Sequence, residues 1–406
     1  MSRHSSKAPT PTVRLRVERL VAGGDGLARA DDGRVVFVPG ALPGEVVDVQ
    51  LVSSKRDFAR GDVVQVVESS PERRAPPCSA WAKGCGGCDW QHADAPAQLA
   101  WKTEIVRESL RRVGRLPEAE VRAGGAVPPW GYRTSMRCSV DRSGRPSLRR
   151  ARSHDDIPIE QCHVAHDRLS VLLGQIRVPG ADELSLRVSA ATGEATAWWQ
   201  PLGLTASELP EGVTVGETAS LVERVGGVSF RVSAPSFFQS GPAAAELLVG
   251  AVADLGAAAL AEAGHVVDAY GGVGLFAATV VPAAARVTLV EGSPAACADA
   301  RSNLVGRDAS VVESTVEAWA DAQSATIGAD VVIADPARRG LGREAVAALA
   351  KLAVPVMVLV SCDPVALARD AQLLSGAGYR HDATTVLDLF PQTHHVEAVT
   401  RFVRFE

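Results

Sequence analysis

The first part of the chain alternates apolar and polar positions. Residues 13–68 do so in short runs such as VRLRVERL and VVQVVE, separated by Gly, Asp and Pro. Alternation with a period of two is typical of strands with one buried face, and several short strands divided by turn residues favour a small barrel. We therefore predict a small, OB-like β-barrel over residues 13–70, preceded by a disordered N-terminus over 1–12.

The rest of the chain changes pattern twice. Residues 99–115, LAWKTEIVRESLRRVGR, have the apolar spacing of one helical face, and 130–235 return to short strands and loops. A helix rich in Ala and Leu is expected over 242–262, and strands and helices alternate after it as in βαβ units. We predict a central α+β domain over 71–235 and a C-terminal α/β domain over 236–406.

Composition limits the class of protein. Hydrophobic residues make up 46% of the 406 positions, enough for a sizeable core. No apolar run approaches the eighteen residues of a membrane span, and the polar start lacks the apolar stretch of a signal peptide, so a cytoplasmic protein is expected. The odd number of cysteines, seven, argues against a disulfide framework and for metal or catalytic use.

Charge is distributed unevenly. Residues 132–152 contain seven arginines and one acid, whereas 236–406 contain nineteen acids and eleven bases. A basic tract beside an acidic half is compatible with a polyanionic partner, although a solvated surface would have the same composition.

A glycine-rich turn points to a nucleoside-containing cofactor. In DAYGGVG, Gly271, Gly272 and Gly274 follow a predicted strand and precede a helix, which allows close approach of a ligand to the backbone. Glu291 ends the next strand, where a carboxylate can hold ribose hydroxyls. The alternatives are a tight turn with no ligand and a nicotinamide enzyme, whose G-x-G-x-x-G fingerprint is absent.

Two more predicted strands end in reactive side chains. DVVIADPARRG ends its strand at Asp335, and VLVSCDPVALARD ends its strand at Cys362. Open α/β sheets place their chemistry at this edge, and the following helix is expected to stabilise a thiolate. A helix-capping Asp and a buried filler Cys are the alternatives. Cys297 is interpreted as filler, and Cys138 is left undecided.

Four cysteines form a candidate metal site. CGGC supplies two thiols, one cysteine lies upstream, and EQCHVAH returns a fourth from the central region. Four thiolates suit either zinc or an iron–sulfur cluster, and a histidine could replace one of them. The candidate ligands are Cys78, Cys85, Cys88 and Cys162, with His92, His163 and His166 as possible substitutes.

These motifs together resemble the RNA uracil-5 methyltransferases, in particular the branch that carries a TRAM domain and a [4Fe-4S] cluster and modifies 23S ribosomal RNA. The resemblance spans nearly the whole chain and rests on ALPGEVVDVQLV with FARGDVVQVVE, C…CGGCDWQH, PSFFQSG, DAYGGVG, DPARRG, SCDPVALARD and DLFPQTHHVEAV. It implies a TRAM barrel, a cluster-bearing central domain and a Rossmann-like S-adenosylmethionine methyltransferase domain with a seven-stranded sheet.

The resemblance also implies roles for individual residues. Cys362 matches the nucleophile that attacks carbon 6 of uracil, and Glu397 matches the base that removes the proton from carbon 5. Cofactor-binding positions fall on Gln239, Tyr270, Glu291 and Asp335, and the cluster ligands on Cys78, Cys85, Cys88 and Cys162. One departure is Asp363, where the family often has Asn; its added negative charge opposes a thiolate.

The implied activity is methylation of a uridine in structured RNA by a cytoplasmic monomer, with 23S rRNA as the expected substrate. A stacked uridine cannot reach the pocket, so the base should flip out while basic side chains hold phosphates. Candidate contacts are Arg133, Arg137, Arg149 and Arg150. The alternatives are a tRNA substrate with the same chemistry, a non-catalytic RNA-binding factor that keeps the fold, and a nucleotide-dependent oxidoreductase.

Overall fold

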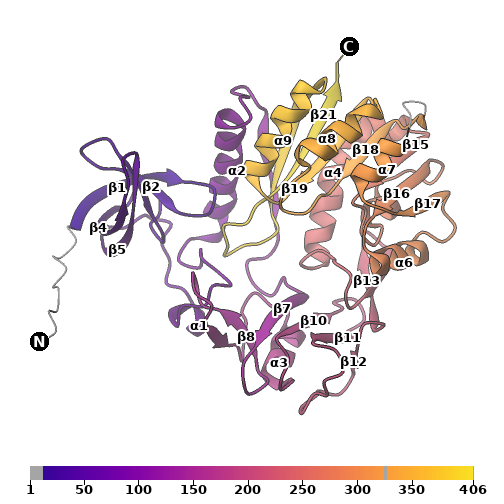
Figure 1. The fold of residues 1–406 in the computed structure, drawn as a ribbon. Helices are drawn as coiled ribbons and strands as arrows, with labels where there is room; N and C mark the ends of the chain where they lie inside the picture. Colours follow the sequence, from indigo (N-terminus) through magenta and orange to yellow (C-terminus); the bar gives the residue numbers. More distant parts are fainter. Residues whose placement is uncertain (1–11, 324–326, 406) are drawn as a thin grey trace, which may run out of the picture.

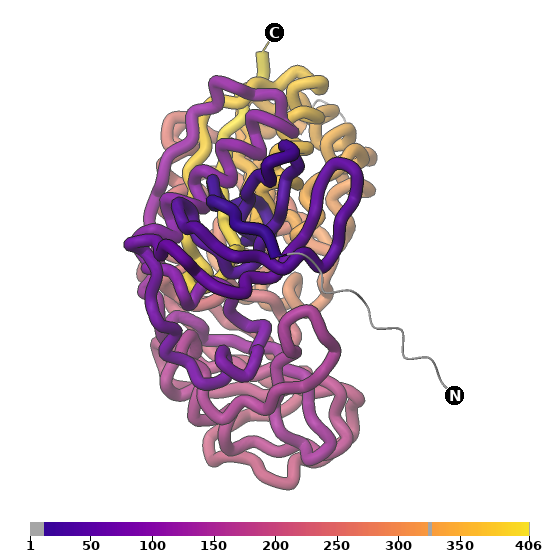
Figure 2. The backbone as a smooth tube through the Cα atoms, turned by 90° about the vertical axis from the view of Figure 1, so that its left-hand side faces the viewer, coloured from indigo at the N-terminus to yellow at the C-terminus, as the bar shows by residue number. Residues whose placement is uncertain are grey.

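The computed structural model describes residues 12–323 and 327–405, and Figures 1 and 2 show their arrangement. The expected disorder of residues 1–11 lies outside this description, and residue 12 begins the first strand. The barrel and the C-terminal domain lie side by side, and the central region extends below both (Figure 1, Figure 2).

The N-terminal part is a closed barrel with the strand order β1-β2-β3-β5-β4. Inward positions carry the apolar residues of the alternating pattern, such as Leu15 and Val17 on the first strand and Val47 and Val49 on the fourth. The predicted OB-like barrel is therefore confirmed. Its strands are β1 (Thr12–Leu20), β2 (Gly26–Arg29), β3 (Val35–Val38), β4 (Val46–Ser54) and β5 (Phe58–Glu68).

A connecting segment leads from the barrel to the C-terminal domain. It contains α1 (Ser79–Ala82) and α2 (Ala95–Arg112). The helix predicted over 99–115 thus starts one turn earlier, since Pro96 is tolerated in a first helical turn. Trp90 and Ile105 pack against barrel residues, and α2 also packs on the C-terminal domain through Val106 and Leu110.

The central region is a six-stranded sheet, order β12-β11-β10-β7-β8-β9, followed by a two-stranded hairpin. Helix α3 (Asp167–Gln175) packs on the sheet through Leu169 and Leu173. The strands are β7 (Ser135–Val140), β8 (Pro146–Arg149), β9 (Asp156–Pro158), β10 (Glu183–Val188), β11 (Ala195–Gln200), β12 (Val213–Val215), β13 (Ser220–Val225) and β14 (Val228–Ser233).

The C-terminal sheet has eight strands in the described residues, not the expected seven, in the order β17-β16-β15-β18-β19-β21-β20-β6. The additional edge strand β6 (Val121–Ala126) comes from the central part of the sequence and pairs parallel to β20. Its sequence, VRAGGA, has little apolar alternation, and its side chains are mostly exposed, so the pattern did not predict a strand there. The others are β15 (His265–Ala269), β16 (Arg286–Glu291), β17 (Ala309–Glu313), β18 (Val331–Ala334), β19 (Val356–Ser361), β20 (Tyr379–Asp388) and β21 (Glu397–Arg404).

Helices cover both faces of this sheet, as expected for a Rossmann-like domain. Val266 and Ile333 face one apolar cluster, which includes α4 to α6, while Val267 and Val332 face the other, which includes α2 and α7 to α9. Burial on both faces explains why the strands are continuously apolar. The helices are α4 (Pro242–Glu262), α5 (Leu275–Thr279), α6 (Pro294–Asn303), α7 (Val316–Ala322), α8 (Gly342–Lys351) and α9 (Pro364–Gly376).

In the described residues, α4 is the one helix long and apolar enough to cross a membrane by composition. Within the protein, 44% of its most apolar window is buried. Leu248, Val252 and Leu255 pack in the core on the sheet. Packing inside the domain therefore accounts for its apolar sequence.

Candidate active site

One cavity lies at the carboxyl ends of the parallel strands of the C-terminal sheet. It measures about 680 Å³ and is lined by all six residues predicted to bind cofactor or substrate: Gln239, Tyr270, Glu291, Asp335, Cys362 and Glu397. Tyr270, Asp335 and Cys362 directly follow β15, β18 and β19, and Glu291 ends β16. Because β21 runs antiparallel to β19, its first residue, Glu397, reaches the same edge. The structure thus brings the six side chains together, while their chemical roles stay predictions.

The glycine turn is shaped by close packing and by Glu291. A Cβ atom at Gly271 would lie 2.5 Å from Leu289 Cγ, so a larger residue would have to displace the Leu289 side chain. The backbone N–H of Gly272 donates to Glu291 Oε2 (3.1 Å), and that of Ser293 donates to Oε1 (2.7 Å). These bonds fix the orientation of the Glu291 carboxylate beside the glycine turn, and the turn leaves open space beside Gly272.

Tyr270, which lines the cavity, has an unusual backbone conformation. Its φ of 59° lies in the left-handed region, which is uncommon for a large side chain. The phenol hydroxyl donates to Glu317 Oε1 (3.2 Å), and burial raises its pKa. The ring is therefore held in one orientation by a hydrogen bond from the neighbouring helix α7.

Two carboxyl groups are buried together deeper in the cavity. Burial raises the pKa of Asp335 to about 7. Burial and the nearby Asp335 carboxylate raise the pKa of Glu397 well above its usual value. Two like charges in one dry pocket repel each other, so the simultaneous ionisation of both carboxyl groups is opposed.

Cys362 lies beside this pair. Burial, Glu397 and Asp335 together raise the pKa of its thiol to about 12, although Arg338 acts in the opposite direction. The expected stabilisation of a thiolate by the following helix is therefore outweighed by the surrounding protein groups. Ionisation of the thiol would need an additional positive charge in the pocket.

The charge of Asp363 is directed away from Cys362. Its Oδ1 accepts the backbone N–H groups of Val365 (3.0 Å) and Ala366 (2.8 Å) and so caps α9. Its Oδ2 lies 3.7 Å from Arg338 Nε. The N-terminus of α9 and the Arg338 guanidinium thus offset the negative charge of Asp363, which the sequence analysis expected to oppose a thiolate at Cys362.

Phe237, Arg338 and Phe390 are among the further side chains that line the cavity without a predicted role. Phe237 is 72% exposed, which is unusual for a phenylalanine, and it lies at the rim of the cavity. All three belong to the motifs PSFFQSG, DPARRG and DLFPQTHH. The motifs indicated that these segments lie near the site, but the sequence alone does not show that the Phe237 ring is exposed.

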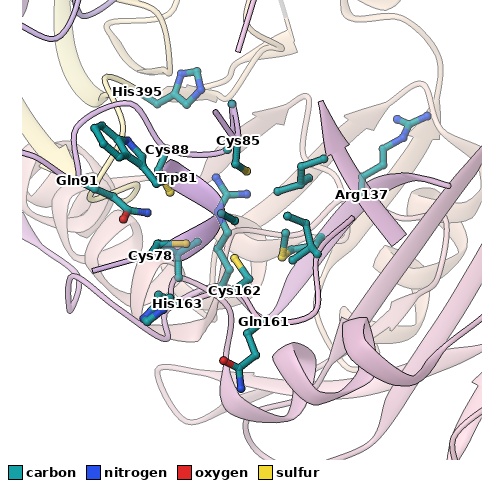
Figure 3. A pocket seen from close by; sticks show the side chains of 18 residues that line it. Cys78, Trp81, Cys85, Cys88, Gln91, Arg137, Gln161, Cys162, His163 and His395 are labelled. Atoms are coloured by element: carbon teal, nitrogen blue, oxygen red, sulfur yellow. The ribbon is translucent and has the colours of Figure 1, made fainter. Parts of the chain in front are cut away.

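The four candidate metal ligands line a second cavity, of about 220 Å³, in the central region. Figure 3 shows Cys78, Cys85, Cys88 and Cys162 gathered around one space, with His395 above them. Burial raises the pKa of Cys85 and Cys162, and that of Cys88 to about 12. In the ranges 12–323 and 327–405, no three His, Cys, Asp or Glu side chains are grouped closely enough to hold a metal ion.

The other cysteine and histidine candidates lie in different surroundings. His163 lines the cysteine cavity, whereas His166 Nδ1 caps α3 by accepting the N–H of Arg168 (3.3 Å). His92 is buried, and burial lowers its pKa to about 4. Cys138 and Cys297 are both buried. Cys138 lies in an apolar cluster, whereas the Cys297 thiol donates to the carbonyl oxygen of Glu291 at 3.3 Å.

The four arginines proposed for RNA contact differ in their surroundings. Arg133 lines the cysteine cavity, and its guanidinium carbon lies 5.5 Å from the centre of the Phe390 ring. The other three are exposed. Arg137 also lines the cysteine cavity, at the edge of the view in Figure 3, and pairs with Glu183. Arg149 pairs with Asp156, and Arg150 Nη1 donates to the carbonyl of Lys83.

Comparisons with known proteins agree with this architecture. Residues 11–64 match the TRAM domain. The solved structure of the Pyrococcus abyssi tRNA (uracil-54, C5)-methyltransferase, in complex with S-adenosyl-L-homocysteine, has a TM-score of 0.70 over 96% of this chain and 100% of that one, with 24% identity. The fold is therefore that of a Rossmann-like methyltransferase with an added barrel.

Sequence relatives define the family. The chain is 34% identical to an uncharacterized RNA methyltransferase of Gloeobacter violaceus over 97% of this chain and 96% of that protein. It is 35% identical to one of Streptomyces coelicolor, over 95% and 91% of the two chains. The protein belongs to this family of RNA methyltransferases, so the interpretation as an oxidoreductase no longer applies.

Proposed function

We propose that the protein transfers a methyl group from S-adenosylmethionine to carbon 5 of a uridine in structured RNA. The observation that carries this proposal is the meeting of a cysteine and two carboxyl groups in one cavity with the glycine turn. Ribosomal 23S RNA is the proposed target, and tRNA is the alternative. We further propose that the enzyme acts as a cytoplasmic monomer, with the barrel (13–70) and the central domain (71–235) holding the RNA for the catalytic domain (236–406).

Carbon 5 of uracil is a poor nucleophile, and we propose that Cys362 activates it. Attack of its sulfur on carbon 6 forms an S–C bond and moves the ring electrons so that carbon 5 becomes enolate-like. The thiol proton leaves to solvent. When bound, S-adenosylmethionine supplies the methyl group on a positively charged sulfur. That charge in the pocket would favour the ionised thiol.

Glu397 completes the reaction. After methyl transfer, carbon 5 carries both a methyl group and a hydrogen. Removal of that proton by Glu397 restores the ring double bond as the bond between carbon 6 and Cys362 breaks. Asp335, Glu291, Gln239 and Tyr270 are proposed to hold the cofactor.

A uridine analogue tests the nucleophile. With fluorine at carbon 5 there is no proton to remove, so the enzyme should remain bound to RNA that contains 5-fluorouridine. We expect an adduct that survives denaturing electrophoresis with the wild type and none with Cys362→Ser. An equal yield from the two proteins would show that Cys362 is not the attacking group.

We also propose that Cys78, Cys85, Cys88 and Cys162 hold a [4Fe-4S] cluster. Zinc–sulfur bonds of about 2.3 Å require the four sulfurs to converge on one ion. The sulfurs instead surround a cavity of about 220 Å³, which suits a group that itself occupies volume. Ionising these buried thiols is also costly, unless the positive charge of a bound metal compensates the thiolates.

Metal analysis tests this assignment. Protein purified without oxygen should be brown and contain about four iron atoms per chain, as the proposed cluster requires. Cys162→Ser, which removes the most distant ligand in the sequence, should lower the iron content. Colourless protein with one zinc per chain would show that the thiols serve a different metal.

A further inference from the structure

The cysteine cavity and the catalytic cavity share a wall. The loop of residues 389–396 joins β20 to β21, and Phe390 lines the catalytic cavity while His395 lines the cysteine cavity. Glu397 follows the loop directly as the first residue of β21. In Figure 3 the loop enters as the yellow ribbon that carries His395 above the cysteines. A shift of this loop would therefore move groups in both sites.

The segment directly after Cys88 holds the loop. The backbone N–H groups of Asp89 and Trp90 donate to the carbonyl oxygen of Gln392, at 3.1 and 2.9 Å. Asp89 Oδ1 accepts the backbone N–H of His394 (2.9 Å), and Oδ2 contacts the His394 ring nitrogen Nδ1. The side chain of Asp89 thus binds the loop at His394, three residues before Glu397, which lines the catalytic cavity.

Other contacts to the loop also come from outside the C-terminal part of the sequence. Gln98 Oε1 accepts the N–H of Gln392 (2.7 Å), and the Tyr132 hydroxyl donates to the carbonyl of Pro391 (3.1 Å). Gln392 has a φ of 70°, in the left-handed region, and is buried. A backbone in this conformation is held by surrounding contacts. These contacts come from residues 78–90, which include three of the cysteines and are called the cysteine segment below, and from Gln98 and Tyr132.

We propose that Asp89 is a positioning residue for the catalytic base: through the loop 389–396, the cysteine segment holds Glu397 where it removes the proton from carbon 5. This inference rests on the proposed function. It gives the cysteine segment a structural part in the last chemical step. This part requires no transfer of electrons or methyl groups at the cysteines. A displaced Glu397 would leave attack by Cys362 and methyl transfer intact, and the methylated adduct would persist.

The test measures that adduct with unmodified uridine. Total RNA from cells that lack this gene is incubated with S-adenosylmethionine carrying a labelled methyl group, and the protein–RNA adduct is separated on a denaturing gel. We expect Asp89→Ala to turn over about tenfold more slowly and to accumulate about tenfold more labelled adduct than the wild type. Asp89→Asn, which keeps the acceptor for the His394 N–H, should restore most of the turnover.

A matched control lies five residues further on. Asp94 has a similarly exposed side chain and pairs with Arg74 at 3.4 Å, outside the loop contacts described above. Asp94→Ala should behave as the wild type. Iron content and affinity for S-adenosyl-L-homocysteine should stay within twofold in all variants, and hydrogen exchange at 392–397 should be faster only in Asp89→Ala.

Glu397→Gln separates the possible failures. If it accumulates labelled adduct but Asp89→Ala turns over as the wild type does, or slows without accumulating adduct, Asp89 does not position the base. If Glu397→Gln forms no adduct either, the proposed chemistry is wrong and the inference falls with it. Should Asp89→Ala not fold, Asp89→Glu, which displaces the carboxylate by one methylene, is expected to show the same accumulation to a smaller degree.

Discussion

Glu397→Gln should stop the enzyme after methyl transfer, with the methylated RNA still bound to Cys362. Glutamine has nearly the same shape but cannot accept a proton from carbon 5. Loss of a positioned general base lowers rates by about 10²- to 10⁴-fold, and we expect a loss in this range for release of 5-methyluridine. A labelled methyl group from the cofactor should therefore appear in a protein–RNA complex that resists denaturation.

The stability of the same variant distinguishes chemistry from folding. Because the pKa of Glu397 is raised in the folded protein, the folded state binds the proton more tightly than the unfolded state. This shift stabilises the fold at low pH, and its contribution is lost as pH rises above the unfolded value of about 4. A neutral glutamine should therefore be at least as stable as the wild type at neutral pH. A variant that is inactive and strongly destabilised, with no adduct, would contradict the assigned role.

The arrangement of the catalytic cavity could be predicted in large part from local patterns. Asp335 and Cys362 each end an apolar run followed by proline or by an Asp-Pro pair. The carboxyl ends of parallel strands meet at one edge, so separate motifs pointed to a common site. Glu397 was different, since it begins an antiparallel strand, and only the resemblance to the uracil-5 methyltransferases indicated it.

Contacts between distant segments could not be predicted in the same way. The offset of the Asp363 charge depends on Arg338, which another strand–turn unit supplies. Strand β6 is recognisable only through its pairing with β20, because its side chains are mostly exposed and show little apolar alternation. Periodicity reports which face of an element is buried, but it does not report the partner that covers it.

Lys102→Met should destabilise the protein strongly, since Lys102 and Asp388 form an ion pair in which both side chains are at most 1% exposed. The Nζ atom lies 2.6 Å from Asp388 Oδ1 and donates to the carbonyl of Phe390 at 3.1 Å. Burial lowers the pKa of Lys102 and raises that of Asp388, so desolvation opposes the charged state of both. Removing one partner of such a pair costs about 3–5 kcal/mol, and we expect a loss of this size in denaturant unfolding followed by tryptophan fluorescence.

The double variant Lys102→Met with Asp388→Leu should recover much of this loss, because no uncompensated charge then remains in the interior. Lys351 provides the control: its Nζ lies 2.7 Å from Asp321, but the two side chains are 60% and 56% exposed. Lys351→Met should change stability by less than about 1 kcal/mol. Equal losses at Lys102 and Lys351 would show that burial does not govern the pair. Lys102 also donates to the Phe390 carbonyl in the loop 389–396. If the double variant regains its stability but turns over more slowly than the wild type, the slower turnover reflects a change in the loop and not in the stability of the fold.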